Sequence, residues 1–186
     1  MSFNVLDYIV LLNDVVPMDL CDEVLSEYGG DKNWSNATVM NGLHRDIRRC
    51  DLIDMSNKLV IQQNENKRQD LDKRLFDCAA LVIKKYNEKF PFTKIERDSG
   101  YTLLRYKENE FYVEHTDHYL KAPRTVSCSF AVNDDYEGGE FAFFERELKY
   151  KIPKGSALMF PSNFMYPHEI MPVTSGIRYS IITWFV

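Results

Sequence analysis

The sequence predicts an α+β, mainly β fold, in which helices precede a sandwich or jelly roll of short strands. Apolar residues recur about every 3.6 positions before about residue 90, and they alternate with polar residues after about residue 100. With 186 residues and 45% hydrophobic content, the chain is long enough for one substantial core and short for two. We therefore expect a single domain over 1–186, with 1–100 as a helical lead-in with supporting strands and 101–186 as the jelly-roll core.

Two helices are predicted in the lead-in. The first begins after Pro17 and ends at Gly29-Gly30, because proline suits a first helical turn and glycine suits a helix C-terminus. The second runs from about 69 to about 89 and is ended by Pro91. Each helix carries one apolar stripe, so each is expected to pack against the outside of a sheet.

Short strands joined by turns follow Pro91. In the strand over 125–132 the alternation is nearly strict, so that small, mostly polar residues such as Ser127 and Ser129 share one face. Such a face suits the interior of a ligand-holding barrel or contact with solvent, and this strand alone favours solvent. The predicted strands cover 101–106, 111–117, 125–132, 140–144, 148–152, 157–160 and 178–186.

The composition narrows the function. A net charge of -5 and a pI near 5.4 leave no broad basic surface for a phosphate backbone, so no nucleic-acid partner is expected. The cysteines Cys21, Cys50, Cys78 and Cys128 are widely spaced without a CxxC pair, which predicts reduced, mostly buried thiols. The apolar run at 8–12 is too short to span a bilayer and lacks a basic flank, so we expect a soluble cytoplasmic protein without membrane association.

The strongest chemical signal is His115 and Asp117. Residues two apart on a strand project from the same face, so both can reach one metal ion, although an HxD triplet taken alone is more often structural. His168 offers a third ligand from a separate predicted element. Two imidazoles and one carboxylate form the facial triad of non-haem Fe(II) oxygenases, which leaves three positions for a co-substrate and dioxygen. The same ligands also suit zinc, so a zinc hydrolase, a metal-binding jelly roll or an inactive binding module remains an alternative.

A further basic residue, Arg178, stands ten positions beyond His168, at the start of the last predicted strand. Arginine has a permanent charge and pairs with carboxylates through two parallel hydrogen bonds. Arg178 therefore suits the distal carboxylate of 2-oxoglutarate.

Together, the HxD triplet, the distal His168 and Arg178 resemble the prolyl 4-hydroxylase-like branch of the 2-oxoglutarate and Fe(II) oxygenases. The resemblance covers at least 101–186, including NDDYEGGE at 133–140 and VTSGIRYS at 173–180. It implies a double-stranded β-helix (jelly roll) with N-terminal helices packed outside the barrel.

The resemblance also implies residue roles. His115, Asp117 and His168 match the iron ligands, and Arg178 matches the residue that pairs with the C5 carboxylate of 2-oxoglutarate. Tyr106 matches a tyrosine that helps to bind the co-substrate, and Ser180 lies on the Arg178 face; a core aromatic and a plain strand serine are the alternatives. Arg124 matches a position at the substrate mouth, with a solvated surface arginine as the alternative, and Tyr112 is a second candidate for substrate contact.

The implied activity is C–H hydroxylation coupled to conversion of 2-oxoglutarate and O2 into succinate and CO2. A peptidyl proline, converted to 4-hydroxyproline, is the first expected substrate, which makes a peptide or protein the expected partner and ascorbate the expected reductant. Prolyl 4-hydroxylases usually carry lysine where Arg178 stands and a small hydroxyl residue where Phe141 stands. A free amino acid or another non-prolyl substrate therefore remains open.

Overall fold

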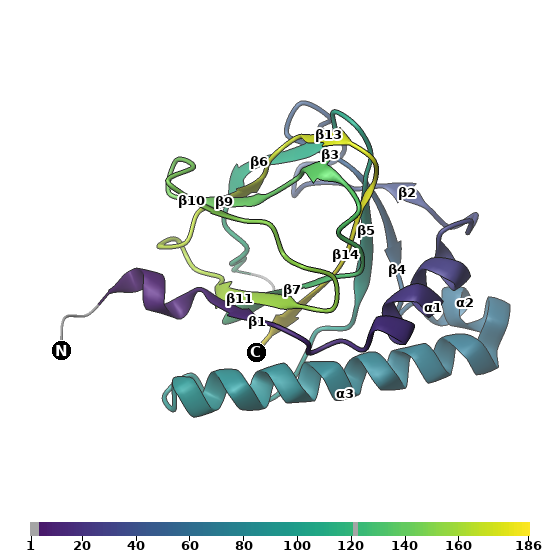
Figure 1. Ribbon diagram of the computed structural model, residues 1–186, viewed down its shortest axis with the longest axis horizontal. Helices are drawn as coiled ribbons and strands as arrows, with labels where there is room; N and C mark the ends of the chain where they lie inside the picture. The colour runs from purple at the N-terminus through teal and green to yellow at the C-terminus, as the bar shows by residue number, and fades with distance from the viewer. Residues whose placement is uncertain (1–3, 121–122) are drawn as a thin grey trace.

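Two antiparallel sheets face each other and form the centre of the fold, as Figure 1 shows. The computed structural model describes residues 4–120 and 123–186. The larger sheet contains, in spatial order, β1 (Val10–Leu12), β11 (Ala157–Pro161), β7 (Val126–Ala131), β14 (Arg178–Phe185), β5 (Thr102–Tyr106), β4 (Asp51–Asp54) and β2 (Ser35–Asn36). The smaller sheet contains β10 (Leu148–Tyr150), β9 (Phe141–Phe143), β12 (His168–Ile170), β6 (Phe111–His115) and β3 (Arg48–Arg49). A two-stranded ribbon pairs β13 (Val173–Ser175) with β8 (Glu137–Gly138).

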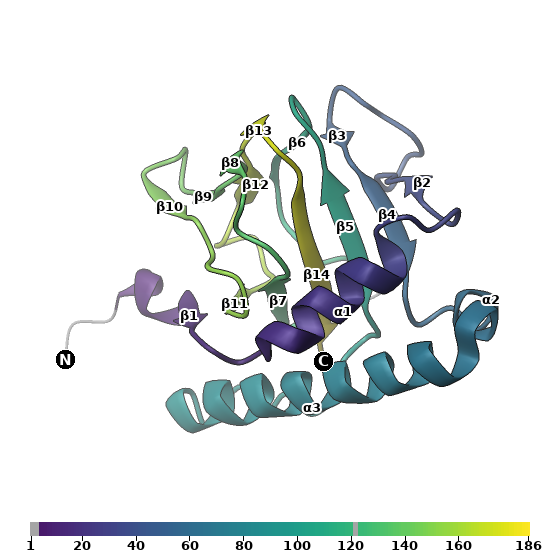
Figure 2. The same cartoon turned by 45° about the vertical axis from the view of Figure 1, so that its right-hand side comes forward.

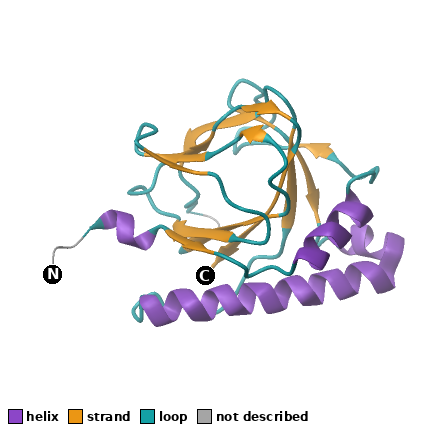
Figure 3. Cartoon of the chain, viewed as in Figure 1, coloured by secondary structure: helices purple, strands orange, loops and turns teal. Residues whose placement is uncertain are grey.

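α1 and α3 lie along the outer face of the larger sheet, and Figures 2 and 3 show them side by side there. Apolar side chains of α3, among them Leu71, Leu75 and Val82, share a core with Val126 and Phe130 of β7. Burying each large apolar side chain contributes about 1.5–3 kcal/mol relative to leaving it exposed. The predicted mainly β jelly roll with helices outside it is therefore confirmed. The helices are η1 (Val5–Tyr8), α1 (Met18–Tyr28), α2 (Lys58–Ile61), η2 (Gln62–Asn64) and α3 (Glu65–Lys89).

The polar face of β7 points between the two sheets. Ser127 and Ser129 are buried and line a cavity there, so the preference for solvent that this strand alone suggested is wrong. The reason is that the smaller sheet covers this face. In the lead-in, β1, β2 and β4 extend the larger sheet and β3 extends the smaller one.

Free, buried thiols are found at all four cysteines, as the spacing predicted. Within the described parts of the chain, none of the helices combines the length and the apolar character that crossing a membrane requires.

The α1–α3 interface contains one buried arginine, Arg68. Its Nε donates to Glu27 at 2.6 Å, its Nη2 donates to Asp31, and its Nη1 donates to the carbonyl of Val60 at 2.7 Å. Removing one partner of a buried ion pair leaves uncompensated charge and costs about 3–5 kcal/mol. We expect Arg68→Ala to lower the free energy of unfolding by about that amount, measured by urea denaturation.

Arg74 offers the matched control on the same helix. It pairs with Asp19 and Glu23, whose side chains are more exposed than those of the Arg68 partners. Exposed ion pairs contribute about 0–1 kcal/mol. Equal losses for Arg74→Ala and Arg68→Ala would contradict a special role for the buried pair.

Candidate functional site

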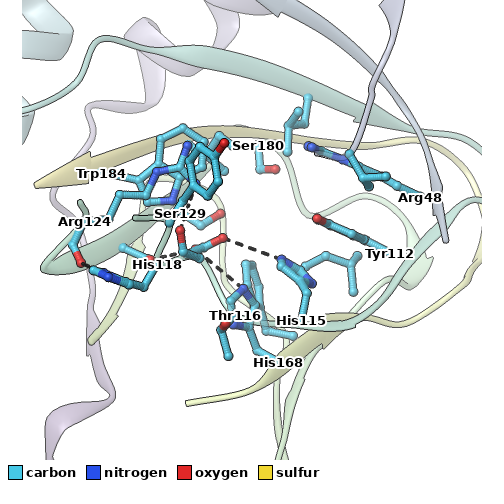
Figure 4. Close-up of a pocket in the computed structure, with 18 of the residues that line it drawn as sticks. Arg48, Tyr112, His115, Thr116, His118, Arg124, Ser129, His168, Ser180 and Trp184 are labelled. Carbon is cyan, nitrogen blue, oxygen red and sulfur yellow. Dashed lines mark hydrogen bonds and ion pairs between the residues drawn. The ribbon is translucent and has the colours of Figure 1, made fainter. Parts of the chain in front are cut away.

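Strand pairing brings the two predicted histidine ligands together. β12 and β6 are antiparallel neighbours, and His168 lies directly opposite His115 in their register. β6 ends at His115, so Asp117 lies in the segment that follows the strand. The prediction of a strand over 111–117, which placed Asp117 on the strand, is therefore wrong at this end. Its carboxylate nevertheless returns to the histidines: Oδ1 is 3.6 Å from Nε2 of His115, and Oδ2 is 3.7 Å from Nε2 of His168 (Figure 4).

Backbone carbonyls set the tautomer of both imidazoles. Nδ1 of His115 is 2.9 Å from the carbonyl oxygen of Val113, and Nδ1 of His168 is 3.1 Å from that of Tyr166. Since a carbonyl oxygen only accepts, each Nδ1 carries the hydrogen. In the neutral form, each imidazole therefore has its Nε2 lone pair on the side of Asp117, as a metal ligand must.

The charge states also suit a cation. Burial, followed by the neighbouring His115, lowers the pKa of His168 to about 4, so this imidazole is neutral near pH 7. Burial pulls the pKa of Asp117 upward, but His168, His115 and a hydrogen bond from Ser127 outweigh it and hold the pKa well below its usual value. The Ser127 hydroxyl donates to Oδ2 of Asp117 at 2.6 Å, which orients the carboxylate.

A metal ion fits these three donors. Their ligand atoms all lie within 4.8 Å of one another, and they form the one such group of His, Cys, Asp or Glu in residues 4–120 and 123–186. Two imidazoles with one carboxylate suit a ferrous ion with open positions, and zinc accepts the same donors.

The site opens into a cavity of about 480 Å³ between the sheets. Arg178 of β14 lines it and is 3% exposed, with Nη1 donating to the Ser180 hydroxyl at 2.9 Å. Within the described chain no carboxylate lies within 4.0 Å of its guanidinium, which is therefore available for an anion. Gly139 gives this side chain room: its backbone has φ +67°, and a Cβ there would lie 3.0 Å from Cδ of Arg178.

Tyr106 stands directly across from Arg178 in the β14–β5 register and also lines the cavity. Its hydroxyl is fully buried and has no hydrogen-bond partner in the described residues. Burial raises the pKa of Tyr106 well above its ordinary value, so the hydroxyl keeps its proton and can donate. A buried polar group without a partner is costly, which makes this atom a natural donor to a ligand in the cavity.

The remaining predicted residues lie around the same cavity. The Tyr112 ring stacks on His115 with centroids 3.6 Å apart. Arg124 donates to the Asp117 carbonyl at 3.1 Å, and its Cζ lies 3.4 Å from the centre of the Trp184 ring. The structure thus brings every predicted site residue to one cavity, including Ser180.

Two contributions escaped the sequence reasoning. Ser127, which orients Asp117, looked like one of several small strand residues. Arg48 lines the cavity from β3, far from the core region in sequence. The sequence around Arg48 and Arg49 does not indicate that Arg48 reaches the cavity, because this position depends on the pairing of β3 with β6. His118 also lines the cavity but does not belong to the metal-ligand group.

A sequence model of the 2OG-Fe(II) oxygenase superfamily matches residues 101–186, the segment that carries the three metal-ligand candidates and Arg178. The predicted resemblance to prolyl 4-hydroxylase-like oxygenases is confirmed, and the family whose model matches implies Fe(II), 2-oxoglutarate and O2.

Hydroxylases are among the proteins whose sequences resemble this chain. A PKHD-type hydroxylase of Synechococcus sp. (strain JA-2-3B'a(2-13)) is 32% identical over an alignment of 89 residues, and the match covers 42% of this chain and 39% of the relative. The chain thus matches about two fifths of that relative's length.

Solved structures show the same fold. A Trichoplax adhaerens prolyl hydroxylase, in complex with a hypoxia inducible factor peptide, superposes with a TM-score of 0.78 at 19% identity, over 97% of this chain and 84% of that one. The viral collagen prolyl hydroxylase of Paramecium Bursaria Chlorella virus-1, in a 2OG complex, gives 0.70 at 17% identity over 98% of both chains.

Proposed function

We propose that this chain is an Fe(II)- and 2-oxoglutarate-dependent dioxygenase that hydroxylates a C–H bond, with His115, Asp117 and His168 holding the iron. The observation that carries the proposal is the convergence of two Nε2 atoms and one carboxylate within 4.8 Å of one another. When bound, the ferrous ion and 2-oxoglutarate supply the activation of dioxygen. One oxygen atom of O2 enters the hydroxylated product and the other enters succinate, with release of CO2.

Arg178, Ser180 and Tyr106 would hold the distal carboxylate of 2-oxoglutarate. Arg178 provides a buried, permanently charged fork that no described carboxylate occupies. The Tyr106 hydroxyl provides a further donor that lacks a protein partner. Phe141 and Phe160 line the cavity with apolar surface, which excludes water and strengthens the charged contacts.

For the substrate, we propose a peptidyl proline converted to 4-hydroxyproline, with ascorbate as reductant. Prolyl hydroxylases among proteins of the same fold support this choice, one of them in complex with a peptide. Arg124 and Tyr112 lie at the cavity and would contact the peptide. A free amino acid or another residue is the alternative substrate.

The test is succinate formation by protein reconstituted with Fe(II) without oxygen and then exposed to O2 and 2-oxoglutarate. We expect slow formation without a substrate and faster formation with a proline-containing peptide from a library, with mass spectrometry showing a gain of one oxygen. Formation of succinate without any hydroxylated prolyl product would support the oxygenase activity but contradict the proposal of a prolyl substrate. Tight zinc binding without any succinate would favour the zinc hydrolase or binding module.

A further inference from the structure

A second guanidinium, Arg48, enters the cavity from the edge strand of the smaller sheet. Its Cζ lies 4.7 Å from the centre of the Tyr112 ring, which in turn stacks on the metal-ligand candidate His115. Nη1 donates to the carbonyl of Thr38 at 3.3 Å, whereas the buried Nε has no partner in the described residues. Figure 4 shows the Arg48 guanidinium extending over Tyr112 toward the middle of the pocket.

The cavity contains more positive than negative protein charge. Three arginines line it, Arg48, Arg124 and Arg178, but Asp117 is the only carboxylate among the described lining residues. No described carboxylate lies within 4.0 Å of any of these three guanidinium groups. Arginine stays protonated in proteins, so burial cannot relieve this excess by proton loss.

Binding of the proposed cofactors leaves the excess in place. A ferrous ion and the doubly negative 2-oxoglutarate neutralise each other, and Asp117 balances one arginine. The cavity then keeps two positive charges, although the chain as a whole carries a net charge of -5. Partly desolvated charge without a partner is costly, and a bound anion would offset that cost.

Arg48 and Arg178 enter the cavity from different sheets. Arg178 projects from β14 of the larger sheet beside Tyr106 and Ser180. Arg48 belongs to β3 of the smaller sheet, where it lies opposite Tyr112 in the register. In Figure 4, Arg48 and Arg124 lie on opposite sides of the metal-ligand candidates, so a substrate at the metal would lie between two cations.

We propose that Arg48 binds a carboxylate of the prime substrate, so that this enzyme acts on carboxylate-bearing substrates. The carboxylate would belong either to an acidic residue next to the hydroxylated one or to the free α-carboxylate of an amino acid or peptide end. The inference rests on the proposed function, because it assumes that the substrate approaches the metal beside Tyr112.

Binding without turnover tests this inference. Protein loaded with Fe(II) and 2-oxoglutarate, kept free of O2, is dialysed against capped peptides containing proline and glutamate and against matched peptides with glutamine in place of glutamate. Free amino acids and their amides form the second pair of probes. Mass spectrometry of the retained ligand is expected to show at least about tenfold preference for the carboxylate member of one pair, since a hydrogen bond to a charged group contributes this much. The pair that shows the preference identifies the source of the carboxylate.

Arg48→Gln is expected to reduce that preference to about threefold or less, and Arg48→Lys should retain part of it. Arg49→Gln is the matched control: it removes the same charge from the same strand, but Arg49 does not belong to the cavity and instead lies over Phe111. The preference of Arg49→Gln for carboxylates over amides should equal that of the wild type. Thermal unfolding of each variant shows that the fold persists.

An equal retention of carboxylates and amides by the wild type would overturn the inference, as would an unchanged preference in Arg48→Gln. A loss of 2-oxoglutarate affinity in Arg48→Gln, measured by the same dialysis, would assign Arg48 to the co-substrate instead. The separate succinate assay reports on the oxygenase itself, so a failure of the proposed function is distinguishable from a failure of this inference.

Discussion

Replacing His115 with alanine is expected to reduce succinate formation by at least about three orders of magnitude, because a catalytic metal contributes several kcal/mol to the reaction. The same result is expected for Asp117→Ala. Each substitution removes one of three converging donors, whose ligand atoms lie within 4.8 Å of one another. Iron retained after gel filtration, measured by elemental analysis, should fall together with succinate formation.

His118→Ala is the matched control for these variants. His118 is an exposed histidine three positions from His115 that contacts the carbonyl of Arg124 and lies outside the ligand group. Iron content in this variant should equal that of the wild type. Full iron retention by His115→Ala, with the fold intact, would show that the metal binds elsewhere.

Arg178→Gln is expected to raise the KM for 2-oxoglutarate by about ten- to a hundredfold, which corresponds to the roughly 1.5–3 kcal/mol of a hydrogen bond to a charged group. kcat at saturating 2-oxoglutarate should change much less, because Arg178 lies beside Tyr106 and Ser180 and not among the metal donors. Initial succinate rates over a range of 2-oxoglutarate concentrations measure both constants. Arg178→Lys should bind 2-oxoglutarate more tightly than Arg178→Gln but less tightly than the wild type, because lysine keeps the charge and lacks the two parallel donors of the guanidinium group.

Ser180→Ala provides the comparison for Arg178. It removes the hydroxyl that accepts from Nη1 of Arg178 but leaves the charge, so its effect on the KM should be several-fold smaller. Because no described carboxylate pairs with Arg178, Arg178→Gln should not lower the melting temperature as the loss of a buried ion pair would. An unchanged KM in Arg178→Gln would remove the arginine from the co-substrate site.

Much of the fold was predictable because helix and strand periodicity is a local property. The helix over about 69–89 became α3, extended at its start to Glu65, and the strand over 178–186 became β14 (Arg178–Phe185). The donor types were local as well: an HxD triplet, a distant histidine and an arginine ten positions later suffice to propose a ferrous site and an anion anchor.

Only the tertiary structure decided which faces meet. The pairing of β12 with β6 sets His168 opposite His115, and coverage by the smaller sheet turns Ser127 from an expected surface residue into a hydrogen-bond donor to Asp117. The same assembly places Arg48 beside Tyr112, although they are far apart in sequence. Spacing along a chain determines the side of a strand on which a residue projects, whereas its neighbours across the sheet depend on strands that are remote in sequence.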